Sequence, residues 1–343
     1  MNKMPEIMKI SLKKIKPFFA LLSSGIFLVL VFQMAYTSFS RSGTLVQQNS
    51  QNELSASVAN AFDGLSLDAE AAYVYDINKN QVLFALHPDE KLPLASITKI
   101  MTTFVARENA SESALITITK DDLSTEGDTG FLVGEHWRMG DLLNAMLIIS
   151  SNDGAHTIAR FIGSGGQPVA PADEAAARTH FVQMMNAQAQ SLGLTEMAFF
   201  NESGLDIVST STASSTINHD RPLLTPGSYG SAHDVALLLT DLWKKYPANL
   251  EITTLPAARI VSQDNIAHVL PNTDEDVGKI PGLIASKTGY TTLAGGNLAV
   301  IFDRGINDPV VAVVLGSSYK GRFNDMTKLV DAAIKDSAIP NKI

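Results

Sequence analysis

The stretch KLPLASITKIMTTFVARE, residues 91–108, contains the pair of residues from which the interpretation of the whole chain starts. Ser96 and Lys99 stand three residues apart at the start of a predicted amphipathic helix. Residues at this spacing share one helix face, so the lysine amine can reach the serine hydroxyl. Apolar side chains at Ile97, Ile100 and Phe104 would bury the helix and exclude water from the pair.

The Ser-x-x-Lys pattern is weak evidence by itself, because it also begins at Ser11 and at Ser317. A serine nucleophile at neutral pH needs a neighbouring group that removes its proton. Lysine can do this only if its pKa falls from ~10.4 toward neutrality, through desolvation or a nearby cation. The alternative for Lys99 is a solvated residue in the first helical turn, and the pair alone favours that alternative.

The composition excludes several classes of protein. A chain of 343 residues with 45% hydrophobic and 18% charged residues can bury a substantial core in one large domain or two. The net charge of −9 argues against a nucleic-acid partner. The absence of cysteine excludes disulfides, thiolate metal sites and a cysteine nucleophile. No His-Glu-x-x-His or Gly-x-Ser-x-Gly motif is present, so we expect no metal, no organic cofactor and seven surface or structural histidines.

The N-terminal 40 residues have the pattern of a membrane segment. Residues 1–16 carry five lysines, and residues 17–40 form an uncharged, mostly apolar run. As a helix these ~24 residues would be about 36 Å long, enough for a hydrocarbon core of about 30 Å. The flanking lysines place residues 1–16 in the cytoplasm and the domain outside. We favour an uncleaved transmembrane anchor over a cleavable signal sequence, and either one sends the domain across the membrane.

The rest of the chain predicts a linker followed by one catalytic domain. Residues 41–65, rich in Ser, Gln and Asn, are typical of a linker, and we expect the domain at residues 66–338. Two β-rich runs around residues 78–80 predict a hairpin. Helical spacing covers residues 141–149, 154–163 and 180–193, the last closed by Gly193. Another predicted helix begins at Ser231, with a capping box to Asp234.

The C-terminal part is rich in predicted strands. Residues 283–291, 296–303 and 309–317 read as strands, and residues 323–336 as a final amphipathic helix. Strands at both ends with helices between them predict an α/β (α+β) fold. In it, the N- and C-terminal segments form one antiparallel sheet flanked by helices, with an inserted all-helical subdomain. Residues 208–226 are a polar excursion on the surface.

Two further motifs follow Ser96 in the chain. Ser150, Ser151 and Asn152 interrupt two predicted helices, and Lys287-Thr288-Gly289 lies on a predicted strand. A short loop between helices can direct side chains into a cleft, and the glycine lets a substrate backbone approach the strand edge. The alternatives are a helix cap for the first motif and an ordinary strand end for the second.

Taken together and in this order, the three motifs resemble those of the penicillin-recognising serine enzymes. The surrounding sequence, from about residue 71 to residue 318, is similar to the low-molecular-mass penicillin-binding proteins, the serine D-alanyl-D-alanine carboxypeptidases. The resemblance implies a β-lactamase/DD-peptidase-like fold. It also implies peptidoglycan stem peptides as substrates and β-lactam antibiotics as covalent ligands.

The resemblance also implies roles in catalysis. Ser96 would be the acylated nucleophile and Lys99 its general base. Ser150 would relay a proton to the leaving D-alanine. The backbone N–H groups of Ser96 and Tyr290 would form the oxyanion hole, where each donor is worth roughly 3 kcal/mol of barrier.

Substrate binding is implied for the remaining motif residues. Asn152 would hold a substrate amide, and Gly289 would give the substrate access to the strand. Lys287 would supply a positive field for the substrate carboxylate and help to keep Lys99 neutral. Thr288 would donate a hydrogen bond to the same carboxylate.

Departures from the family pattern leave other functions open. Ser151 stands where the family often has glycine and would add a side chain to the cleft wall, and residues 208–226 look inserted. A D,D-endopeptidase of peptidoglycan cross-links would use the same site. A class A β-lactamase needs a deacylating glutamate in a Glu-x-x-Leu-Asn pattern, which does not follow Asn152. A non-catalytic sensor of wall peptides is the alternative from another functional class.

Overall fold

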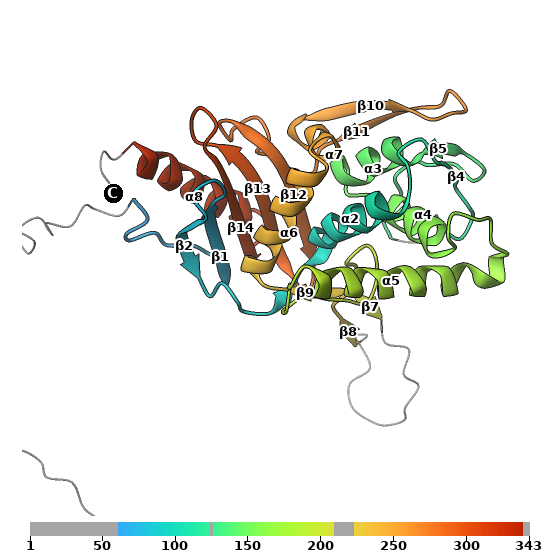
Figure 1. Cartoon of the computed structure of the whole chain (residues 1–343), viewed down its shortest axis with the longest axis horizontal. Helices are drawn as coiled ribbons and strands as arrows, with labels where there is room; N and C mark the ends of the chain where they lie inside the picture. The colour runs from blue at the N-terminus through green and yellow to red at the C-terminus, as the bar shows by residue number, and fades with distance from the viewer. Residues whose placement is uncertain (1–60, 124–125, 209–222, 339–343) are drawn as a thin grey trace, which may run out of the picture. The chain divides into compact units, whose positions relative to one another are not determined.

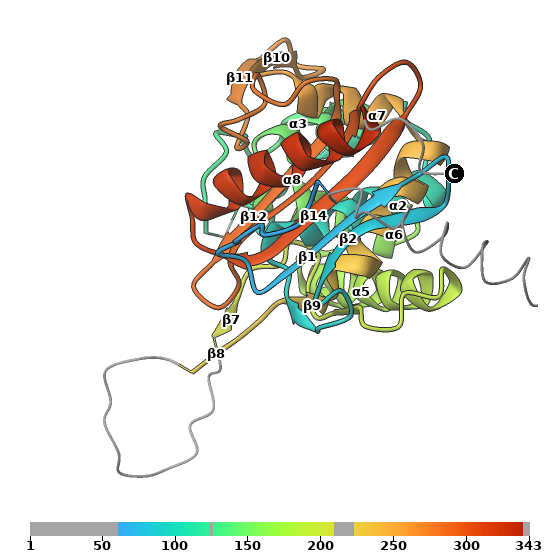
Figure 2. The same ribbon diagram turned by 90° about the vertical axis from the view of Figure 1, so that its left-hand side faces the viewer.

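A five-stranded antiparallel sheet forms the centre of the fold (Figures 1 and 2). The structure, a computed structural model, describes residues 61–123, 126–208 and 223–338. The strand order is β12-β13-β14-β1-β2. These strands are β1 (Ala71–Asp76), β2 (Gln81–Leu86), β12 (Leu283–Thr291), β13 (Gly295–Asp303) and β14 (Pro309–Ser317). Since β1 pairs with β14, the two ends of the domain share one sheet, which confirms the predicted fold class.

The predicted hairpin is formed by β1 and β2, which pair antiparallel. Its turn contains Asn80 in the left-handed region, at φ 56°, a conformation that asparagine tolerates better than most residues. The Lys79 backbone N–H donates to Asp76 Oδ1 at 2.8 Å and closes the turn. The short-range pattern of the sequence therefore determines this element.

The sheet separates two layers of the core because side chains alternate between its faces along each strand. On β14, Val310, Ala312 and Val314 pack with the C-terminal helix α8 (Gly321–Ser337). Val311 and Val313 belong to the core of the opposite face, which also contains side chains of α6 (Ala232–Lys245). Figure 2 shows α8 lying across one face of the sheet.

Four helices form a second region beside the sheet (Figure 1). They are α2 (Lys99–Asn109), α3 (Met139–Ile148), α4 (Asn152–Gly163) and α5 (Glu174–Ser191). Gly193, at φ 72°, ends α5 as predicted, and the next backbone N–H donates to Ala189 O at 3.0 Å. The cap of α6 is also confirmed, because the Asp234 N–H donates to Ser231 Oγ at 3.0 Å.

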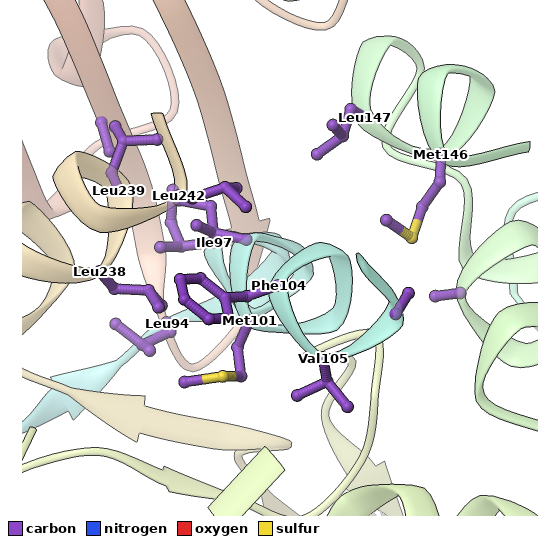
Figure 3. Packing of buried hydrophobic residues seen from close by; sticks show 14 of the residues in the cluster. Leu94, Ile97, Met101, Phe104, Val105, Met146, Leu147, Leu238, Leu239 and Leu242 are labelled. Atoms are coloured by element: carbon purple, nitrogen blue, oxygen red, sulfur yellow. The ribbon is translucent and has the colours of Figure 1, made fainter. Parts of the chain in front are cut away.

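The sequence predicted an amphipathic helix here, with one face buried. Helix α2 instead has all of its sides buried over its first two turns. Every residue from Lys99 to Ala106 is buried, including two threonines and the lysine. A helix buried on all sides is a central core element rather than a surface helix. Figure 3 shows Met101 and Phe104 of α2, and Ile97 just before it, beside Leu238 and Leu242 of α6.

Short elements connect these layers. The turn η2 (Ala95–Thr98) precedes α2, and η3 (Pro171–Asp173), α7 (Ala248–Glu251) and η4 (Ile252–Thr254) are similarly brief. The sequence analysis missed the hairpin of β10 (Ala257–Val261) and β11 (Ala267–Pro271). The other short strands are β3 (Leu92–Pro93), β4 (Leu115–Thr117), β5 (His136–Arg138), β6 (Ala198–Phe199), β7 (Ile207–Val208), β8 (Leu224–Thr225) and β9 (Ser228–Gly230).

Parts of the predicted domain organisation lie outside the described residues. The segments 1–16 and 17–40, with nearly all of the linker 41–65, are among them, as is most of the excursion 208–226. Strands β7 and β8, at the two ends of that excursion, pair antiparallel. Within the described ranges, no helix has the length and apolar character needed to cross a membrane. Phe62 already packs into the core beneath α8, ahead of residue 66.

Gly163 at the end of α4 allows this helix to approach α5 closely. A Cβ atom at this position would lie 1.9 Å from Ala177 O, a backbone atom that cannot move aside cheaply. We predict that Gly163→Ala lowers the free energy of unfolding by about 1–3 kcal/mol. Gly278→Ala is the matched control, because a Cβ there meets nothing within 4 Å. Urea unfolding measures both, and equal stabilities of the two variants would contradict the prediction.

Candidate active site

Ser96 and Lys99 meet at the junction of η2 and α2, as the spacing predicts. Lys99 Nζ lies 2.9 Å from Ser96 Oγ. The preceding residue, Ala95, has a left-handed φ of 49°, which is unusual for a residue with a side chain. Backbone strain of this kind persists only where surrounding contacts hold it. Here Thr98 Oγ1 donates to Ala95 O at 2.6 Å.

The Lys99 amine has three polar neighbours and no exposure to solvent. Besides Ser96 Oγ, it lies 2.8 Å from Asn152 Oδ1 and 2.8 Å from the backbone carbonyl oxygen of Ser203. The two carbonyl oxygens can only accept hydrogen bonds, whereas the serine hydroxyl can also donate one. An uncharged amine has two N–H groups and one lone pair. The two carbonyls therefore take both N–H groups and leave the lone pair directed at the Ser96 hydroxyl.

Burial lowers the pKa of Lys99 to about 7, and the negative charge of Glu202 partly opposes that effect. A large fraction of the amine is therefore uncharged at neutral pH. Desolvation was one of the two causes that the sequence analysis allowed. The other, a nearby cation, involves Lys287, because two neighbouring amines disfavour each other's charge: burial first and then Lys99 lower the pKa of Lys287 well below its usual value.

The loop between α3 and α4 supplies the second motif. Ser150, in the left-handed region at φ 60°, accepts a hydrogen bond from Lys287 Nζ at 2.8 Å. Asn152 binds the Lys99 amine through Oδ1 and donates from Nδ2 to Glu126 O at 2.7 Å. The motif thus connects both lysines of the site. The predicted contact of Asn152 with a substrate amide stays a prediction, since Asn152 already binds two groups of the chain.

Ser151 does not line the cleft, contrary to expectation. It is buried and caps α4, because its Oγ accepts a hydrogen bond from the Gly154 N–H at 2.9 Å. It also shares a 2.6 Å hydrogen bond with Thr129 Oγ1. The capping alternative is correct for this residue alone, while its two neighbours face the site.

The third motif lies on β12, an edge strand of the central sheet. Lys287 Nζ donates to the carbonyl oxygen of Thr288 at 2.7 Å, and Thr288 Oγ1 lies 2.6 Å from Thr273 Oγ1. A cavity of about 340 Å³ opens here. Its lining comprises Ser96, Ser150, Asn272, Thr273, Glu275, Thr288, Gly289, Tyr290, Tyr319 and Arg322.

The three motifs therefore converge on one cleft, and a comparison with known proteins identifies the family. A sequence profile described as D-alanyl-D-alanine carboxypeptidase matches residues 55–319. The chain belongs to the D-alanyl-D-alanine carboxypeptidase family.

Individual relatives carry two related activities in their names. A D-alanyl-D-alanine carboxypeptidase of Mycobacterium tuberculosis is 29% identical over 256 residues, which are 74% of this chain and 77% of the relative. A D-alanyl-D-alanine endopeptidase of Haemophilus influenzae is 28% identical over 263 residues, 74% of this chain and 79% of the relative. Against a 28% identical carboxypeptidase of Bacillus subtilis, the chain spans 63% of the relative's length.

A solved structure supports the same fold. The ampicillin-bound form of penicillin-binding protein D2 from Listeria monocytogenes has a TM-score of 0.61 and 27% sequence identity. The similarity covers 78% of this chain and 98% of the Listeria chain. A β-lactamase/DD-peptidase-like fold is thereby established.

Gly289 is needed in this carboxypeptidase-family site for a reason that the sequence did not indicate. A Cβ atom at this position would lie 2.8 Å from Leu94 O and 3.2 Å from Ser96 N. The strand edge is therefore crowded by the chain segment that carries Ser96, rather than only by a substrate. Tyr290 follows on the same strand edge and is half exposed. Its ring packs edge-to-face against that of Tyr319, with 5.0 Å between the ring centroids.

Two functional contacts were missed because nothing in the sequence marks them. Arg322 lies in the first turn of α8, is buried, lines the cavity and donates from Nη1 to Gly289 O at 2.8 Å. Ser203 acts through its backbone carbonyl, which any residue type supplies. A second cavity of about 420 Å³ near the start of α3 contains no residue of the three motifs.

We predict that acylation by penicillin depends on the uncharged form of Lys99. Below the pKa of about 7, the amine is protonated and cannot accept the Ser96 proton, so the rate falls as the pH is lowered. Lys99→Met should slow acylation by about 10²–10⁴-fold. Stopped-flow measurements with a fluorescent penicillin test both statements. Lys244→Met, at an exposed position of α6, should keep the wild-type profile, and a flat wild-type profile would contradict the prediction.

Proposed function

We propose that the chain is a serine D-alanyl-D-alanine carboxypeptidase that removes the terminal D-alanine from peptidoglycan stem peptides. The observation that carries this proposal is the buried Lys99 amine, which lies 2.9 Å from Ser96 Oγ and 2.8 Å from each of two carbonyl oxygens. This arrangement makes Ser96 a nucleophile at neutral pH without histidine. The family relationship supports the choice of substrate.

The proposed reaction has two steps. Ser96 Oγ attacks the carbonyl carbon of the penultimate D-alanine while its proton moves to Lys99. The tetrahedral intermediate then collapses: the C–N bond breaks, and the leaving D-alanine takes a proton through Ser150, which shares the cavity with Ser96. Water hydrolyses the resulting ester and regenerates the serine. The predicted oxyanion hole, the N–H groups of Ser96 and Tyr290, would stabilise both tetrahedral states.

The cationic side of the cleft suits a substrate that ends in a carboxylate. Lys287 and Thr288 stand on β12, and the Arg322 guanidinium lines the same cavity from α8. A buried guanidinium presents several donors in one plane to a carboxylate. We infer that Arg322 joins Lys287 and Thr288 in binding the C-terminal carboxylate of the substrate.

Three alternative functions of the same site can be distinguished from carboxypeptidase activity. Endopeptidase action on cross-links uses the same nucleophile, and one relative of similar identity carries that name. For a β-lactamase, a carboxylate must activate the deacylating water. Glu275 is the one acidic residue that lines the described cavity, and it pairs with Lys320. We therefore expect the penicillin acyl-enzyme to persist. A non-catalytic sensor is disfavoured, because the nucleophile and its base are in contact.

The activity can be tested with two substrates. We predict that the protein releases free D-alanine from a pentapeptide ending in D-Ala-D-Ala, and that Ser96→Ala lowers the rate by roughly 10³-fold or more. Ser191→Ala, on the exposed end of α5, is the control and should leave the rate unchanged. Cleavage of a cross-linked muropeptide alone would show an endopeptidase, and no product from either substrate would support the sensor.

The role of Arg322 can be separated from catalysis by changing the substrate. We predict that Arg322→Met lowers kcat/KM about 10–100-fold for the free-acid peptide, because a charge-assisted hydrogen bond of about 1.5–3 kcal/mol is lost. The same peptide with an amidated C-terminus has no carboxylate and should react equally with both enzymes. An equal loss with both peptides would instead indicate a structural role for Arg322.

We also propose that the domain works outside the cytoplasm, held to the membrane by residues 17–40. The lysine-rich residues 1–16 and the uncharged run that follows them support this orientation. We predict that the full-length chain fractionates with membranes and that protease added from outside degrades the domain. Release of the domain in soluble form would support signal cleavage, and protection from the protease would contradict the proposed orientation.

A further inference from the structure

A buried carboxylate, Glu202, lies next to the general base and belongs to none of the three motifs. Only 3% of Glu202 is exposed. Its backbone carbonyl accepts a hydrogen bond from Thr102 Oγ1 at 2.6 Å, and the next carbonyl, of Ser203, accepts from Lys99 Nζ at 2.8 Å. Both contacts are made by α2, so this loop is fixed against the helix that carries the base.

Basic side chains from three helices surround the Glu202 carboxylate. His156 of α4 places Nδ1 3.1 Å from Oε1, and Arg178 of α5 places Nε 3.9 Å from the same oxygen. Lys99 of α2 is the third. Arg178 Nη1 also donates to Asp121 Oδ2 at 2.8 Å. Among the described residues, Oε1 makes no hydrogen bond, so its contacts are electrostatic.

Glu202 and burial act on Lys99 in opposite directions. Burial lowers the pKa of the amine to about 7, and the nearby carboxylate raises it. A general base is most effective when its pKa lies near the working pH, because a less basic amine accepts a proton poorly. A cation beside Glu202 weakens the field of the carboxylate at Lys99. Glu202 and Arg178 would therefore adjust, in opposite directions, the basicity that burial leaves to the amine.

We propose that Glu202 is a positioning residue that keeps the Lys99 amine basic enough to accept the Ser96 proton, and that Arg178 limits this effect. The proposal rests on the proposed use of Lys99 as the base. It assigns a catalytic consequence to a cluster formed by the buried Glu202 and the partly buried His156 and Arg178, none of which lines the substrate cavity.

Removal of the Glu202 charge and removal of the Arg178 charge should shift the pH profile of acylation in opposite directions. Glu202→Gln removes the negative charge, so protonated Lys99 loses a stabilising partner and the acidic limb of the pH profile should move down by about 1 pH unit. Arg178→Met removes the compensating cation, and the limb should move up. A purely structural role would slow both variants without moving either limb.

The readout is the second-order rate constant for acylation by a fluorescent penicillin, measured from pH 5 to pH 9. Glu202→Asp should restore the wild-type limb, and Glu251→Gln, an exposed glutamate at the end of α7, should not change it. Acylation reports proton removal from Ser96 whether or not D-alanine is released. A wild-type enzyme that is acylated but releases no D-alanine would refute the proposed function and leave this test intact.

The outcome that overturns the proposal is an Arg178→Met profile that stays in place or moves to lower pH. The same holds for a folded Glu202→Gln variant whose limb does not move. If Glu202→Gln fails to fold, the direction of the Arg178→Met shift decides the question alone. Circular dichroism spectra and thermal unfolding establish folding before each profile is measured.

Discussion

The hydrogen bonds of one buried amine determine the chemistry of this protein. Lys99 Nζ lies within 2.9 Å of two carbonyl oxygens and one hydroxyl. An ammonium group in this position would have donated to all three, and Ser96 would have lost no proton. In the uncharged state the carbonyls bind both N–H groups, so the only remaining partner for the lone pair is the Ser96 hydroxyl. The three contacts fit both protonation states of the amine, and burial favours the uncharged one.

The fold can tolerate the buried Lys99 on a fully packed helix because the amine can lose its charge there. Transfer of an unpaired charge into the core would be very costly, and a group in that position loses its charge instead. Apolar neighbours on α2 and α6 keep water away from the amine. The three partners of the amine come from η2, from the start of α4 and from the loop after β6. Displacement of α4 or of the loop after β6 would leave an N–H group without an acceptor, and displacement of η2 would remove the hydroxyl that faces the lone pair.

The sequence predicted those parts of the fold and site that depend on local patterns. Alternating and helical spacing located the sheet and the helices, and the motif order led to Ser96, Lys99 and Ser150. It could not predict that α2 is buried on all sides, because its threonines read as a polar face. Nor could it locate the Ser203 carbonyl or Arg322, since a backbone oxygen has no sequence signature and one arginine in a surface-type helix resembles any other.

The distribution of charge explains how one cleft can bind an anion and still keep its base uncharged. On the cavity side, Arg322 belongs to the lining, and the buried Lys287 binds Ser150 of the same lining. Lys99 is also buried and does not line the cavity, and the charge of Glu202 acts on it. Asp274, buried and bound by Ser286 Oγ, offsets part of the positive charge of Lys287 and Arg322. A bound substrate carboxylate would add negative charge on that side and stabilise the cations there. In the proposed mechanism, proton transfer to Lys99 would create a positive charge that Glu202 stabilises, so substrate binding and base catalysis would use separate counter-charges.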